Sequence, residues 1–110
     1  MQTVLIQQIP VGPMANFSYL IIDMASKKTA YVDPGFETQK VIDRSQKMGV
    51  TIDKILITHT HFDHIQELDK AFEILKVPVY VSGIEIAALE EMRIPAHAVV
   101  DNDCISLENA

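Results

Sequence analysis

Apolar and polar residues alternate in short runs over the first third of the chain, which is the pattern of β-strands. Three runs are expected to be strands: Val4–Ile9, Phe17–Asp23 and Thr29–Val32. Pro10, Gly12 and Pro13 end the first run, because proline cannot donate to a strand ladder and glycine relieves the turn. The turn at Lys27 and Lys28 is short and polar, so the second and third runs are expected to pair as a hairpin.

Two later segments have the spacing of helices. Thr38–Met48 carries its apolar residues near one face, and Gly49 follows it in a position that commonly ends a helix. Farther along, apolar residues recur at i, i+3, i+7 and i+10, namely Ile65, Leu68, Phe72 and Leu75. Charged residues occupy the positions between them, so this segment is predicted to be an amphipathic helix, which Pro78 ends.

The last part of the chain alternates again between the two kinds of element. Val79–Val81 is predicted to be a strand, and Ser82 with Glu85 forms a plausible capping box for a short helix. His97 is interpreted as an ordinary loop histidine, because it has no partner at ligand spacing. Residues 99–107 are expected to form two short strands around a polar turn.

The chemistry of the chain is concentrated after one apolar run, Lys54–Thr58. Three apolar residues follow one another in it, which is typical of a strand buried on both faces in a partly parallel sheet. Ligands gather at the carboxyl ends of such strands. At this end stand three of the four histidines of the chain and one aspartate, namely His59, His61, Asp63 and His64.

The spacing of these four residues predicts metal binding. In extended backbone His59 and His61 point the same way and can hold one ion. Asp63 and His64 diverge by about 100° if they open a helix, so they suit a second ion. Imidazole with carboxylate suits zinc, iron or manganese, and no thiolate stands nearby. The alternative is that these histidines bind nothing and are surface or core residues.

The same residues, read as H-x-H-x-D-H, resemble the first metal motif of the metallo-β-lactamase superfold, and most of all its glyoxalase-II-like hydroxyacylglutathione hydrolases. Val32–Gly35 also resembles the V-D-P-G that follows the third strand in such proteins. The resemblance implies an α/β fold in which residues 1–110 form a single half domain. That half of the αββα sandwich has one mixed β-sheet with about three helices.

The resemblance also implies a reaction. His59 and His61 would bind a first metal, and Asp63 and His64 a second, so that up to two zinc ions, or iron or manganese, hold a hydroxide that hydrolyses a thioester or ester of a small molecule. Asp63 is the candidate catalytic residue, because it could also hold or deprotonate the attacking water. Asp33 is either a residue that orients a histidine through its far ring nitrogen or a cap of its own turn.

Two features depart from the family pattern. The family completes its site with two more histidines and a bridging aspartate from its second half, beyond the segment that ends at Ala110. With two protein ligands per metal, weak metal binding and poor hydrolysis by this chain alone are expected. Gln66 and Glu67 stand where relatives often carry small residues, and are expected to add bulk and charge beside the site.

Composition narrows the range of partners. Fifteen acidic and nine basic residues give a net charge of −6 without any lysine or arginine cluster, which argues against nucleic acid as a partner. No apolar run reaches the ~18 residues of a membrane span, and no basic segment precedes the first apolar run. The single Cys104 cannot form an intrachain disulfide and is interpreted as a small buried hydrophobe. A cytoplasmic protein that contacts neither membranes nor nucleic acid is expected.

The half-sandwich predicts an association. In the full fold two sheets pack face to face, so one half alone would leave an apolar sheet face in water. A homo-oligomer formed through that exposed face is therefore expected. An alternative function follows from it, namely a catalytically silent metal-binding half-domain that associates with itself or with a complementary half.

Overall fold

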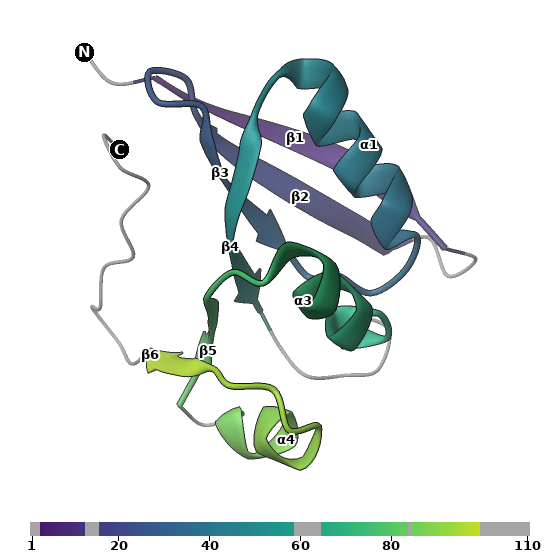
Figure 1. Cartoon of the computed structure of the whole chain (residues 1–110), viewed down its shortest axis with the longest axis vertical. Coiled ribbons are helices and arrows are strands. Elements are labelled where there is room, and N and C mark those ends of the chain that lie inside the picture. The colour runs from purple at the N-terminus through teal and green to yellow at the C-terminus, as the bar shows by residue number, and fades with distance from the viewer. Residues whose placement is uncertain (1–2, 13–15, 59–64, 84, 100–110) are drawn as a thin grey trace.

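The computed structural model describes residues 3–12, 16–58, 65–83 and 85–99. Strands and helices alternate along most of the chain, as Figure 1 shows. Their order is β1 (Val4–Val11), β2 (Asn16–Asp23), β3 (Lys28–Val32), α1 (Thr38–Met48), β4 (Thr51–Ile57), α3 (Leu68–Leu75), β5 (Val79–Ser82), α4 (Ile86–Glu91) and β6 (His97–Val99).

All six strands belong to one sheet, in which sequence order and spatial order are the same. The pairs β1–β2 and β2–β3 are antiparallel, whereas the three pairs from β3 to β6 are parallel. The predicted hairpin of β2 with β3 and the predicted parallel placement of the Lys54–Thr58 run are therefore confirmed. One mixed sheet with three helices in the described residues is the architecture expected for part of the sandwich.

The core lies on the face of the sheet that α1 covers (Figure 1). Leu20, Tyr31, Ile55 and Val79 stand opposite one another in register across four strands, and each is fully buried. Residues that alternate with them point to the other face. Burying one face of these four strands in this way fixes their register, because a slip by one residue would exchange the two faces.

Helix α1 begins and ends where the sequence predicts it. Val41 and Ile42 are buried against the sheet. Gly49 ends the helix with a φ of 70°, and the N–H groups of Gly49 and Val50 bond to the carbonyls of Gln46 and Ser45. Glycine adopts this left-handed conformation without the steric cost that a Cβ brings.

The structure corrects two expectations in the last third of the chain. Ser82 is the final residue of β5 and pairs with Val99, and it is not the N-cap of the next helix. Helix α4 instead has Glu85 at its N-cap, without a side-chain capping bond. His97 lies at the start of β6 rather than in a loop, and its ring stacks on that of Tyr80 at 5.1 Å between centroids.

Two other expectations have more limited outcomes. The amphipathic helix predicted from Ile65 begins as α3 at Leu68, although Ile65 is also buried. Of the two strands predicted over 99–107, residues 100–107 lie outside the described residues. No helix in the described ranges is long and apolar enough to span a bilayer.

Candidate metal centre

The four predicted metal ligands, His59, His61, Asp63 and His64, all lie in segment 59–64, outside the described residues. Both flanks of this segment are described: Thr58 follows β4, and Ile65 precedes α3. The ligand assignment therefore stays a prediction. What the structure establishes is how the two ends of the segment are held.

The entrance to segment 59–64 is held by Asp33. Strands β3 and β4 are parallel neighbours, so Asp33 and Thr58 both follow the carboxyl ends of adjacent strands. The Thr58 N–H donates to Asp33 Oδ1 at 2.7 Å, and the Thr58 hydroxyl donates to Oδ2. The Asp33 N–H in turn donates to the Leu56 carbonyl at 2.9 Å. Asp33 thereby ties the first residue after β4 to the end of β3.

Asp33 takes this position in an uncommon backbone conformation. Its φ is 56° and it is only 4% exposed. Aspartate is among the few residues other than glycine that adopt left-handed backbone without large cost. Its main-chain carbonyl also accepts a hydrogen bond from the buried Ser18 hydroxyl at 2.8 Å. Asp33 therefore braces Thr58, a role the sequence interpretation lacked, while its proposed contact with a histidine falls outside the described residues.

The exit from segment 59–64 is held by Glu67. The Glu67 N–H donates to the Pro34 carbonyl at 3.1 Å. Its side chain reaches α1, where Oε1 accepts the Thr38 N–H at 2.8 Å. The half-buried carboxylate is therefore bound to α1, and this contact qualifies the expectation that Glu67 simply adds charge beside the site.

The surroundings of Glu67 favour its ionised form. Partial burial is the largest single influence and opposes ionisation, but the hydrogen bonds from Thr38, the charge of Lys70 and the Glu37 N–H together outweigh it. The pKa of Glu67 consequently lies below its usual value. A carboxylate at a helix N-terminus is expected to behave in this way, because the first N–H groups of a helix lack partners within it.

Behind these contacts lies a buried polar pair. The Tyr31 hydroxyl donates to Thr38 Oγ1 at 3.4 Å, and Tyr31 is fully buried. Burial raises the pKa of Tyr31 to about 12, although hydrogen bonds with Thr38 and Ser18 act in the opposite direction. Sequence reasoning did not single out Ser18, Thr38 or Thr58, and it named Glu67 only for its bulk and charge. Ser18 could have been identified as a hydroxyl residue at an inward-facing position of an otherwise apolar strand.

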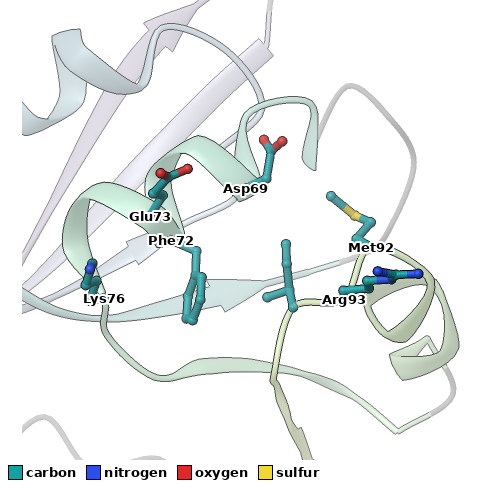
Figure 2. Close-up of a pocket in the computed structure, with 7 residues that line it drawn as sticks. Asp69, Phe72, Glu73, Lys76, Met92 and Arg93 are labelled. Carbon is teal, nitrogen blue, oxygen red and sulfur yellow. The ribbon is translucent and has the colours of Figure 1, made fainter.

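A hollow of about 490 Å³ lies beside α3 rather than between Thr58 and Glu67 (Figure 2). Phe72 points into it from α3, and Met92 faces it from the end of α4. Its charged lining consists of Asp69, Glu73, Lys76 and Arg93, so two carboxylates offset two cations. In the described part of the chain no group of three or more His, Cys, Asp or Glu residues could hold a metal. The residues that line the hollow are therefore not an alternative metal centre to segment 59–64.

The donor set of segment 59–64 fits a first-row metal. It offers three imidazoles and one carboxylate within six positions, a combination that suits zinc and iron. The segment starts at the carboxyl end of a parallel strand, where ligand-binding loops of α/β sheets commonly lie.

Comparison with known proteins agrees with this reading of the fold. Residues 11–91 match the family model of the metallo-beta-lactamase superfamily. Over 72 residues the chain is 33% identical to BaeB of Bacillus velezensis, described as a probable polyketide biosynthesis zinc-dependent hydrolase, with 66% of this chain and 32% of that protein covered. Over 75 residues it is 37% identical to YqgX of Bacillus subtilis, a probable metallo-hydrolase, with 68% and 35% covered.

A solved structure shows the same architecture. A metallo-beta-lactamase from Staphylococcus aureus superposes with a TM-score of 0.78 at 26% identity, covering 97% of this chain and 32% of that one. The matched part of the chain thus covers about a third of the length of each of these three proteins. The glyoxalase-II-like branch stays a prediction. The match over residues 11–91 is nonetheless most of the chain, which therefore belongs to the metallo-β-lactamase superfamily.

Proposed function

We propose that this chain supplies the first metal-binding part of a metal-dependent hydrolase that cleaves a thioester or ester. The observation that carries the proposal is the place of H-x-H-x-D-H between two held ends, Thr58 at the end of β4 and Glu67 at the start of α3. The zinc-dependent hydrolase among the relatives supports the same chemistry.

The residues of segment 59–64 would have different roles. His59 and His61 would hold one metal ion, and Asp63 and His64 a second. Zinc or iron, when bound, would supply Lewis acidity that polarises a carbonyl oxygen and lowers the pKa of water. Asp63 would accept a proton from the attacking water or orient it. Asp33 would keep Thr58, and with it the entrance to the segment, against the sheet.

The first experiment measures metal content per chain by inductively coupled plasma mass spectrometry. Zinc or iron is expected in the wild-type chain at partial occupancy, because each ion has two protein ligands here. Its loss is expected in the His59→Ala, His61→Ala double variant, because two imidazoles of one ion are removed. The matched control is His97→Ala, which deletes the remaining histidine, stacked on Tyr80 in β6. Metal that persists in the double variant, or that is lost equally in the control, contradicts the ligand assignment.

A second candidate function is a silent metal-binding half-domain that associates with a second copy. The observation that favours it is the sheet face opposite α1, where Val4, Ile6 and Phe17 are 43%, 62% and 40% exposed. Zinc-dependent turnover of a small thioester, abolished by His59→Ala, supports the hydrolase. Absence of turnover at saturating zinc leaves the silent half-domain as the function of this chain.

A further inference from the structure

One loop holds both ends of the proposed metal segment. The connection from β3 to α1 contributes Asp33, which binds Thr58 at the entrance, and Pro34, whose carbonyl accepts the Glu67 N–H at the exit. The first turn of α1 contributes the Thr38 N–H, which binds the Glu67 carboxylate. The β3–α1 connection and the first turn of α1 therefore hold both ends of the segment. Thr38 and Glu67 are 29 residues apart in sequence.

The start of α1 lacks the usual local cap. Its N-cap residue Glu37 has a φ of 51° and makes no side-chain capping bond, and no acidic residue occupies its first turn. Helices leave their first N–H groups without internal partners, and a side-chain oxygen normally satisfies one of them. Here the oxygen comes from Glu67, which stands at the start of a different helix.

We propose that Glu67 is a positioning residue of the metal centre: by capping α1 through Thr38, it sets where α3 begins and hence where the exit of the 59–64 segment stands relative to Thr58. This inference rests on the proposed function, because it presumes that the segment binds metal. Asp63 and His64 lie close to this exit in sequence, so the second ion depends on it more than the first.

A helix cap with a purely structural role would have a different signature. It would stabilise α1 and leave metal binding unchanged in the folded chain. A positioning role requires that metal affinity change in variants that remain folded. Direct partners of metal ligands contribute about 10- to 100-fold to metal affinity. Glu67 binds the backbone of α1 instead, so a change at the lower end of that range is expected.

The test compares two substitutions of Glu67 with a control at the other end of α1. Glu67→Ala removes the acceptor, whereas Glu67→Gln keeps an oxygen that can accept the Thr38 N–H. The control Gly49→Ala puts a Cβ on a residue with a φ of 70° and open space around it, so it destabilises α1 by backbone strain alone. Zinc affinity is measured by competition with a chromophoric chelator, and ligand geometry by the absorption spectrum of the cobalt(II)-loaded chain.

Glu67→Ala is expected to weaken zinc binding about 10-fold and to alter the cobalt spectrum. Glu67→Gln is expected to remain within a few-fold of wild type, and Gly49→Ala to match wild type in both readouts. If Glu67→Ala does not fold, Glu67→Asp replaces it, since its shorter side chain withdraws the carboxylate from Thr38.

Two outcomes overturn different statements. Zinc affinity and cobalt spectrum unchanged in folded Glu67→Ala would reduce Glu67 to a helix cap and leave the proposed function intact. A wild-type chain that binds no zinc would overturn the proposed function, and the positioning role with it.

Discussion

At the scale of single residues, hydrogen bonds fix the polar groups around Thr38. Tyr31 is fully buried in the row of side chains that crosses the sheet, and its hydroxyl reaches Thr38, the residue that also binds Glu67. A phenol in this position is stable as long as it stays neutral, because burial disfavours its charged form.

Tyr31 therefore makes the stability of the chain sensitive to alkaline pH. Its pKa is about 12 in the folded chain against a usual 10.0, so the unfolded chain loses the proton first. The stabilising effect is complete below pH ~10 and is lost as pH rises towards ~12, by about 2–3 kcal/mol for two pKa units. Urea unfolding between pH 8 and pH 11.5 measures it.

Tyr31→Phe provides the comparison, because it removes the ionisable group and keeps the ring. This variant is expected to lose less stability than wild type over the same pH interval. Tyr19→Phe is the matched control, since Tyr19 lies on β2 and is only half-buried. Equal pH dependence in wild type and Tyr31→Phe would refute the assignment.

At the scale of elements, α3 connects the metal segment to the core. Leu68 and Ala71 of α3 are fully buried, whereas Ile74 on the same helix is 48% exposed. The buried side of the helix, rather than its length of eight residues, must hold it in place, because helices this short are marginal in water without packing.

Leu68→Ala is consequently expected to lower the free energy of unfolding by about 2–5 kcal/mol, since it removes buried methyl groups and leaves a cavity. Ile74→Ala is the matched control and is expected to cost less than about 1 kcal/mol, because half of its side chain is already in water. Denaturant unfolding followed by circular dichroism measures both. Similar losses in the two variants would mean that α3 does not pack as the structure shows.

At the scale of the whole molecule, the sheet has one face covered by helices and one with exposed apolar side chains. Val4 and Ile6 of β1 lie on the same face as Phe17 of β2, as the pairing of Ile6 with Ile21 and of Pro10 with Phe17 requires. Sheets pack face to face through such surfaces, at about 10 Å. A second copy offers a surface of the same kind.

We therefore expect the chain to form a dimer through this face, and Ile6→Lys to weaken it, because a charge would be buried in the contact. The matched control is Ile74→Lys, which adds the same charge to an exposed position on α3, in the layer that covers the other face. Sedimentation velocity over a range of concentrations distinguishes monomer from dimer. A wild-type chain that remains monomeric throughout refutes the association.

The elements were predictable wherever their signals are local. Helix α1 runs over Thr38–Met48 as predicted, because helical spacing and a terminal glycine act within one segment. The strand before the histidines was identified from its uninterrupted apolar run for a related reason. Ser82 and His97 were assigned wrongly, because pairing between β5 and β6 overrides their local preferences.

The sequence by itself determined strands β1 to β5 in outline, the helices and the set of metal-binding residue types that follow β4, because periodicity and ligand chemistry reside in neighbouring residues. Only the tertiary structure decided that Asp33 holds Thr58 and that Glu67 caps α1. These contacts join residues 25 and 29 positions apart. They exist because β3 and β4 are parallel neighbours, so the loops that follow these two strands lie at the same end of the sheet.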